Sequence, residues 1–102
     1  MSTERPGSSA GTPFDLDGAW RLAPGVAVRP ERFGALLYHF GTRRLSFLKS
    51  PALLAVVSSL ERHRSARDAC AAAGVTAAEL PCYARALAAL ADSAMIRADT
   101  GR

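Results

Sequence analysis

The sequence predicts an α+β fold of winged-helix-like type, in which an N-terminal three-stranded antiparallel sheet precedes three α-helices. Short apolar runs separated by turn residues fill the segment from Trp20 to Pro51. A helix-start signal, Ser50-Pro51, follows the last of these runs directly. The remainder, to about Ile96, is rich in alanine and carries apolar residues at helical spacing.

The first strand region is predicted on either side of a turn, in Trp20–Leu22 and Val26–Arg29. Between them, Pro24 and Gly25 fit the central positions of a type II turn, where glycine supplies the positive φ. Apolar and other residues alternate from Val26 onward, which is typical of a half-buried strand. Pro30 has no N–H, so it ends the pairing or occupies an edge position.

The second and third strands are predicted over Phe33–Phe40 and Arg44–Leu48, with a hairpin turn at residues 41–43. The second strand is apolar at both parities, which indicates a central strand covered on two faces. The third strand is predicted to place Leu45 and Phe47 on one face, and Arg44, Ser46 and Leu48 on the other.

The first helix is predicted to begin at Ser50-Pro51, since the serine hydroxyl can cap free N–H groups and proline is favoured at the first helical position. It is expected to end near residues 62–64, where the basic run Arg-His-Arg complements the helix dipole.

Two capping boxes predict the starts of the second and third helices, at Ser65–Asp68 and Thr76–Glu79. Gly74 is predicted to end the second helix as a left-handed cap, in a Schellman pattern. The third helix has Pro81 one turn in, which predicts an irregular start. Residues 95–97 are expected to add a short strand, as the wing of a winged helix does.

Charge is concentrated in the predicted sheet. The 102-residue chain has a net charge of +4. The sheet region carries a single acidic residue, Glu31, against five basic ones: Arg29, Arg32, Arg43, Arg44 and Lys49. Such a surface suits an acidic peptide or a nucleic-acid backbone, and equally a surface that only promotes solubility.

No catalytic or metal-binding constellation is found in the sequence. His39 and His63 lie on different predicted elements, and neither is paired with a nucleophile. Cys70 and Cys82 fit neither a zinc pattern nor a redox CxxC pair. We therefore expect a binding module, with no cofactor and no enzymatic activity.

Composition also predicts the organisation and location of the chain. Residues 1–15 are expected to form a disordered Ser/Gly/Pro-rich tail, residues 16–98 one domain, and residues 99–102 a loose C-terminus. The N-terminus lacks the apolar stretch of a signal peptide, and no run is long enough for a membrane span. These features predict a cytoplasmic protein without membrane contact.

The segment up to Pro51 resembles the mycofactocin biosynthesis chaperone family, which is similar to the PqqD-like peptide recognition elements. The resemblance extends from about Trp20 to Ile96. It is carried by the motifs Val28-Arg29-Pro30-Glu31, Phe33-Gly34-Ala35-Leu36-Leu37-Tyr38, Arg43-Arg44-Leu45 and Phe47-Leu48-Lys49.

The resemblance implies a stand-alone chaperone that binds the leader of a ribosomally synthesised precursor peptide and presents it to a radical S-adenosylmethionine maturase. In the wider family the leader lies against the third strand, beside the third helix, which in physical terms is strand addition at an open sheet edge. Carried to this chain, the strand side of the site comprises Arg43, Arg44, Leu45, Ser46, Phe47 and Leu48. The helix side comprises Glu79, Tyr83, Arg85, Ala86, Leu87 and Leu90.

Tyr83 and Leu87 can also be explained as core residues, and helical spacing favours the core for Leu87. A DNA-binding winged-helix regulator is the alternative function, suggested by the helix-turn-helix and the isoelectric point near 9.8. The composition of the predicted third helix argues against DNA binding, because Arg85 is its one basic residue beside two acids, so no nucleic-acid partner is expected.

A monomer is expected, and a dimer formed by pairing of two third strands remains an alternative.

Overall fold

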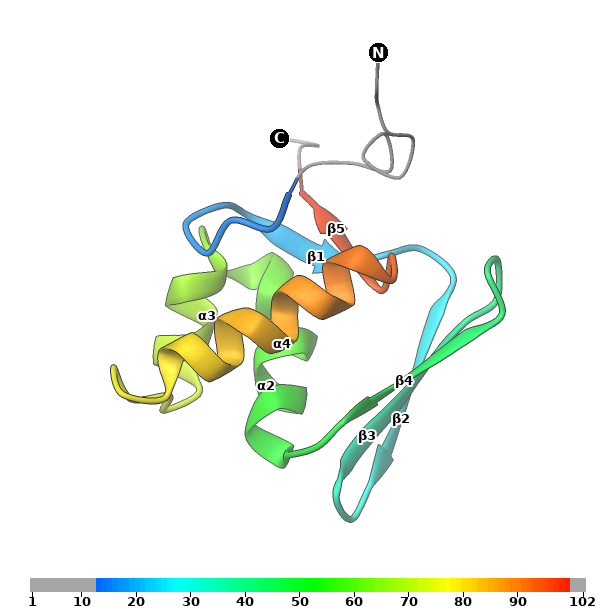
Figure 1. The fold of residues 1–102 in the computed structure, drawn as a ribbon, viewed down its shortest axis with the longest axis horizontal. Helices are drawn as coiled ribbons and strands as arrows, with labels where there is room; N and C mark the ends of the chain where they lie inside the picture. The colour runs from blue at the N-terminus through cyan, green and yellow to red at the C-terminus, as the bar shows by residue number, and fades with distance from the viewer. Residues whose placement is uncertain (1–12, 100–102) are drawn as a thin grey trace.

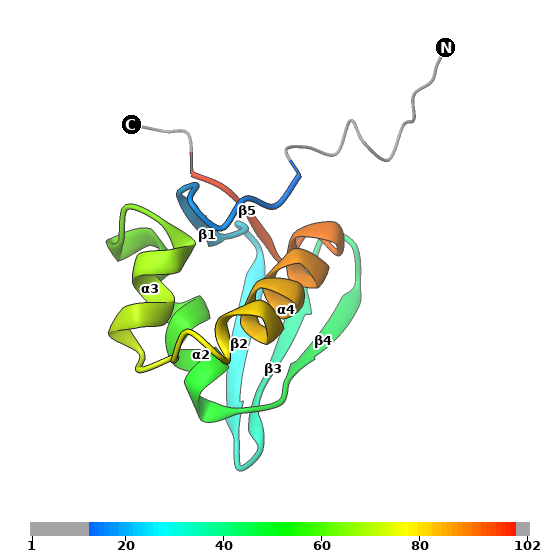
Figure 2. The same ribbon diagram turned by 60° about the vertical axis from the view of Figure 1, so that its left-hand side comes forward.

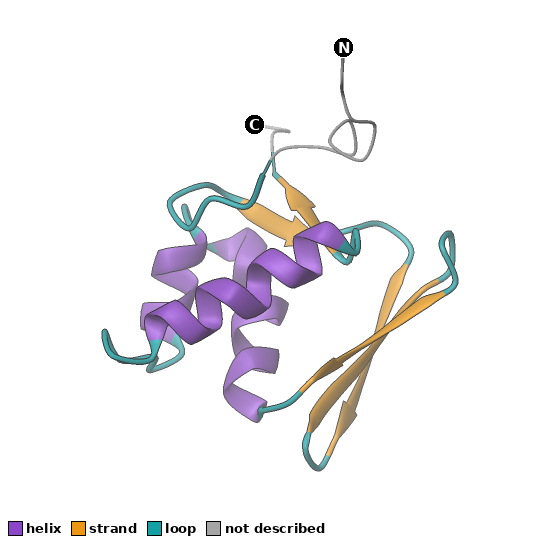
Figure 3. Ribbon diagram, viewed as in Figure 1, coloured by secondary structure: helices purple, strands orange, loops and turns teal. Residues whose placement is uncertain are grey.

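A computed structural model describes residues 13–99. The expected disorder of the two termini falls largely on residues 1–12 and 100–102, which lie outside the described residues. The fold is α+β with strands before helices, as predicted (Figures 1 and 3). The elements are β1 (Trp20–Leu22), β2 (Val26–Glu31), β3 (Gly34–His39), β4 (Arg44–Leu48), α2 (Pro51–Ser59), the 3-10 helix η1 (Leu60–Arg62), α3 (Ala66–Ala72), α4 (Leu80–Asp92) and β5 (Ile96–Ala98).

Strands β2, β3 and β4 form an antiparallel sheet in that order, so the predicted second strand is the central one. Register pairs Leu36 with Phe47 and Leu37 with Ser46. The expectation that β3 is covered on both faces is wrong. All helices pack on one side of this sheet (Figure 1), because the chain turns directly from β4 into α2 and stays on that side.

β1 does not belong to the three-stranded sheet. It pairs antiparallel with β5 and forms a separate two-stranded sheet with it. The predicted turn at Pro24-Gly25 is present, with the Val26 N–H donating to the Ala23 carbonyl over 3.3 Å and Gly25 at φ 86°. The Ala23 N–H donates to the carbonyl of Met95, which directly precedes β5, so the chain before this turn is held by the C-terminal segment. The turn therefore joins two sheets, and a winged-helix arrangement is not confirmed.

Each predicted helix start is confirmed by its cap. The Ser50 hydroxyl accepts from the Leu53 N–H at 3.0 Å, and the Ser65 hydroxyl accepts from the Asp68 N–H at 3.0 Å. Thr76 and Glu79 form a reciprocal box, each side chain accepting from the other's N–H. Regular helix follows only at Leu80, which agrees with the irregular start predicted from Pro81.

Helix α3 ends in the predicted Schellman motif. Gly74 adopts φ 88°, and the N–H of Val75 donates to the Cys70 carbonyl at 3.0 Å. The end of α4 repeats the motif with an alanine in place of glycine. Ala94 adopts φ 65°, and the Met95 N–H donates to the Leu90 carbonyl at 2.8 Å. This second cap directs the chain back toward β1.

The core lies between the helices and the two sheets. It contains apolar side chains from every strand pair and helix, among them Trp20, Ala35, Leu37, Leu48, Val56, Leu60, Cys70, Leu87, Met95 and Ile96. Trp20 connects the N-terminal segment to this core. Its Nε1 donates to the Asp15 carbonyl at 2.9 Å, and its ring lies 5.0 Å from that of Phe14. Figure 2 shows β1 and β5 closing one end of the helical layer.

Candidate functional site

Strand β4 is an edge of the three-stranded sheet. In an antiparallel edge strand, alternate residues direct their N–H and C=O groups away from the neighbouring strand. The other edge, β2, includes Pro30, which has no N–H to donate. β4 contains no proline. Of the two edges, β4 is therefore the one that offers an uninterrupted set of backbone groups to a further strand.

An open apolar groove of about 440 Å³ lies next to the end of β4. One wall is formed where β4 passes into α2, by Lys49, Ser50 and Leu53. The other wall comes from the first turns of α4 and is formed by Cys82, Tyr83 and Ala86. Figure 1 shows α4 crossing α2, and Figure 2 shows the first turns of α4 near the start of α2. Two segments far apart in the sequence thus form one groove.

Gly34 fixes the strand side of this groove. It adopts φ 150°, and a side chain at this position would overlap the Leu48 carbonyl oxygen and lie 2.8 Å from the Ser50 nitrogen. Only glycine allows the start of β3 to pass this close to the junction of β4 and α2. The groove wall at Lys49 and Ser50 is consequently held by backbone packing.

Two of the predicted helix residues, Tyr83 and Ala86, line the groove. Leu87 and Leu90 do not, because they point into the core, with 0% and 5% of their surface exposed. The core position that helical spacing favoured for Leu87 agrees with this burial, whereas the prediction of Leu90 as an accessible contact does not. At 3.6 residues per turn, positions 83, 86, 87 and 90 share one side of α4, so the groove takes the first residues of this stripe and the later ones are buried in the core.

The predicted orientation of the Leu48 side chain also needs correction. We predicted an outward side chain available to a partner, but Leu48 is fully buried and opposite Ala35 in the register. The predicted alternation along β4 is present, but the face that carries Leu48 is the buried one. Ser46 and Leu48 face the helices, while Leu45 and Phe47 are 56% and 60% exposed on the other face.

The charged residues of the predicted site have different positions. Arg43 and Arg44 are exposed at the hairpin end of β4, with Arg43 at φ 65°. Arg85 is exposed on α4. The Glu79 carboxylate accepts from the Thr76 N–H at 3.0 Å, so its role in the structure is that of a helix cap.

Sequence reasoning missed four groove residues: Lys49, Ser50, Leu53 and Cys82. Helical spacing could have suggested Cys82, since it lies one turn before Ala86 on α4. No pattern in the sequence indicates that Leu53 faces α4, because that depends on how the two helices cross.

The two thiols lie in contrasting environments. Cys70 is fully buried in α3, and this burial raises the pKa of its thiol. Cys82 is exposed at the groove. His39 has a structural role at the hairpin, because its Nδ1 accepts from the N–H groups of Gly41 and Thr42 at 3.0 and 3.2 Å. Cys82 thus provides a natural reporter of the groove.

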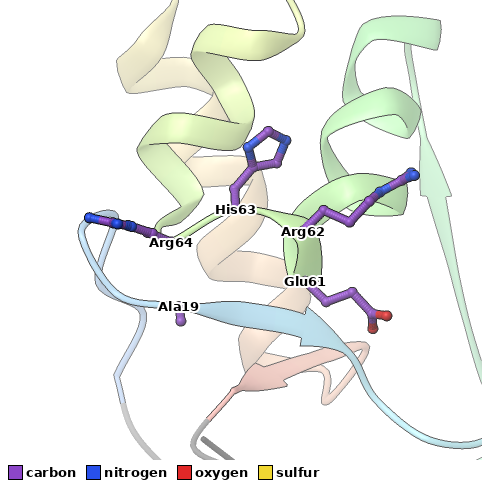
Figure 4. A pocket seen from close by; sticks show the side chains of 5 residues that line it. All are labelled: Ala19, Glu61, Arg62, His63 and Arg64. Atoms are coloured by element: carbon purple, nitrogen blue, oxygen red, sulfur yellow. The ribbon is translucent and has the colours of Figure 1, made fainter.

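A second hollow, of about 310 Å³, lies beside η1 (Figure 4). The side chains of Arg62 and Arg64 point away from one another there, and His63 points in a third direction. Glu61 forms an ion pair with Arg21 at 3.3 Å. Because these polar groups do not converge, the hollow has no ligand geometry.

Two features of residues 13–99 bear on the class of protein. No group of three or more His, Cys, Asp or Glu side chains is placed to hold a metal ion in this range. No helix within it has the length and apolar character required to cross a bilayer.

Comparison with known proteins identifies relatives over most of the domain. Residues 19–97 match the model of the peptide chaperone MftB family. The curated protein peptide chaperone MftB of Mycobacterium ulcerans is 60% identical over 83 residues, covering 81% of this chain and 76% of the relative. The proteins of the same name from Mycobacterium tuberculosis and Mycolicibacterium smegmatis are 57% and 55% identical over 83 residues. These cover 81% of this chain and 76% and 81% of the respective relatives. No solved structure matches the chain. With this family match and this identity over four fifths of its length, the chain belongs to the peptide chaperone MftB family.

Proposed function

We propose that the chain is a peptide chaperone of mycofactocin biosynthesis, which binds the leader of the precursor peptide by strand addition to β4 and presents it to a radical S-adenosylmethionine maturase. One observation carries the proposal: the open edge of β4 leads directly into an apolar groove between α2 and α4. Membership of the peptide chaperone MftB family supports it.

Backbone pairing and the groove have different roles in this proposal. An extended leader satisfies the outward N–H and C=O groups of β4, and these hydrogen bonds place few demands on its sequence. A leader side chain at the end of the added strand enters the groove between Leu53 and Tyr83. Tyr83 presents a rigid ring with a polar end, a combination favoured at interfaces. Ordering the leader costs free energy, so the groove contact supplies selectivity as well as affinity.

Charge favours an acidic leader. Lys49 lines the groove, Arg43 and Arg44 are exposed at the other end of β4, and Arg85 is exposed on α4. A leader carrying carboxylates next to an apolar anchor would pair with both features. The protein acts in this proposal as a cytoplasmic monomer without catalytic groups or a cofactor of its own.

The DNA-binding alternative is not proposed. Helix α4 would be the reading helix, and between Leu80 and Asp92 it carries Arg85 as its single basic residue. Major-groove recognition requires several donors on such a helix.

Calorimetric titration with the precursor peptide tests the groove. Ala86→Lys places an ammonium group among the apolar groove residues, and we expect peptide affinity to fall at least about tenfold. Ala89→Lys is the matched control, since Ala89 is exposed on the same helix and lies outside the groove. It should bind within about twofold of the parent protein. Equal affinity of the two variants would refute the groove as the peptide site.

Hydrogen exchange and thiol labelling test the strand and the groove separately. Peptide addition should protect alternate amides of residues 44–48, as strand pairing requires. It should also slow alkylation of Cys82, while Cys70 stays unmodified with or without peptide. Unchanged exchange along β4 at saturating peptide would rule out strand addition even if the groove were occupied.

A further inference from the structure

The face of the three-stranded sheet that points away from the helices is apolar and open. The large exposed hydrophobic residues in the described chain are Phe33, Phe40, Leu45 and Phe47, with exposures of 47%, 62%, 56% and 60%. All four belong to this sheet or to its hairpin ends. We call this surface the outer face.

Ring contacts and register show that these residues form one continuous surface. The rings of Phe33 and Phe47 lie 6.1 Å apart, edge to face, and those of Tyr38 and Phe40 lie 5.0 Å apart. Across the strands, Phe47 is opposite Leu36 and Leu45 is opposite Tyr38. The outer face thus extends from one hairpin end of the sheet to the other. Contiguous apolar surfaces of this kind mark interaction sites.

The border of the outer face is basic. Arg29 is opposite Leu36 in the register and forms an ion pair with Glu31 at 2.8 Å. Within residues 13–99, no ion pair is formed by Arg32 and Arg43, the exposed cations of the two hairpins at which this sheet ends. The border therefore carries uncompensated positive charge.

This charge indicates which of two partners, a second copy of the chain or a different protein, would bind the outer face. A second copy of the chain packed face to face would bring two basic borders together, which is unfavourable. A different protein with an apolar contact patch surrounded by carboxylates would complement both the centre and the border. The charge of the surface thus favours a hetero-complex.

We propose that the outer face is a docking surface for a folded protein partner with an apolar, acid-bordered patch, and that it remains open while peptide is bound. The second part rests on the proposed function. A strand added at the edge of β4 covers neither face of the sheet, and its alternate side chains extend the outer face. The partner then contacts chaperone and peptide together, and it binds the loaded chaperone more tightly than the empty one.

Binding of the purified maturase, measured with and without saturating precursor peptide, tests this inference. The double variant Phe33→Ser/Phe40→Ser removes apolar surface outside β4 and away from the groove. We expect it to keep peptide affinity within about twofold and to lose at least about tenfold in maturase affinity. Wild-type protein should bind the maturase more tightly when peptide is present.

A charge-reversal pair tests the border. Arg32→Glu lies at the hairpin between β2 and β3, and Arg64→Glu, at an exposed position between η1 and α3, is its control. Of the two variants, Arg32→Glu alone should weaken maturase binding. It should also reduce the salt dependence of that binding, whereas Arg64→Glu should leave it unchanged.

The outcomes separate this inference from the proposed function. If Ala86→Lys abolishes peptide binding while Phe33→Ser/Phe40→Ser leaves maturase binding unchanged, the outer-face inference fails and the proposed function stands. If the double variant converts a dimer into a monomer at constant maturase affinity, the occupant is a second copy and the inference is overturned. If Ala86→Lys leaves peptide binding intact, it is the groove in the proposed function that fails.

Discussion

The two faces of one small sheet are both largely apolar but have opposite environments. On the inner face, Ala35, Leu37 and Leu48 are fully buried, whereas Leu45 and Phe47 on the outer face are more than half exposed. Leu45 and Leu48 are the same residue type, three positions apart on one strand. The difference arises because all helices pack on one side (Figure 1). Hydrophobicity alone therefore does not reveal which side of a strand supports the fold and which side is available to a partner.

The largest effect should come from the glycine that joins the inner face to the groove. In Gly34→Ala, the new methyl group overlaps the Leu48 carbonyl and the backbone keeps a positive φ, so the free energy of unfolding should fall by about 4 kcal/mol. Chemical denaturation measures this loss.

Gly25→Ala is the control for this substitution. Gly25 also has a positive φ, of 86°, but a methyl group there meets nothing within 4 Å, so backbone strain alone should cost about 1 kcal/mol. Equal losses in the two variants would show that the close approach at Gly34 is unimportant.

A matched pair of leucine truncations tests the comparison directly. Leu48→Ala leaves a cavity in the core and should destabilise the fold by about 3 kcal/mol. Leu45→Ala removes an exposed side chain and should cost less than about 1 kcal/mol. Urea denaturation of both variants measures the difference. Comparable losses would mean that the outer face is covered in solution, for example in a dimer.

The smallest effect concerns a solvent-exposed contact and shows how little such contacts contribute. Arg67 Nε donates to Asp17 Oδ1 at 2.7 Å, and this hydrogen bond, with the positive charge of Arg67, lowers the pKa of Asp17. Because the folded-state pKa lies below the unfolded value, the contribution is complete above the unfolded pKa and is lost as pH falls through the folded one. Asp17→Asn should lower the melting temperature slightly between about pH 5 and pH 7, and the difference should vanish under acid conditions. A difference independent of pH would assign it to another cause.

Local signals predicted the elements well because they act within a few residues. The Ser50 cap, the Ser65 cap and the box of Thr76 and Glu79 are all present as hydrogen bonds. The hairpin between β3 and β4 and the central position of β3 are likewise confirmed. Each depends on side chains close in sequence or on a run of apolar residues.

Pairing between distant segments was not predictable in the same way. Nothing in Trp20–Leu22 specifies β5 as its partner in place of β2, because the alternation along a strand does not indicate which strand lies beside it. The burial of Leu48 and Leu90 was not foreseen for a related reason. Periodicity defines which residues share a face of an element, but it does not say which face meets the core.

The amino-acid sequence by itself determined the α+β class, the starts of the helices, the glycine-capped end of α3, the alternation along β4 and the resemblance to a chaperone family. Tertiary structure alone decided that β1 leaves the main sheet, that Leu53 and Cys82 line a groove with Tyr83, and that the sheet keeps one apolar face open. The physical reason is the distance along the chain over which each kind of interaction acts. Caps and periodicity are satisfied by neighbours along the chain, whereas the burial of a face depends on where helices many residues away come to rest.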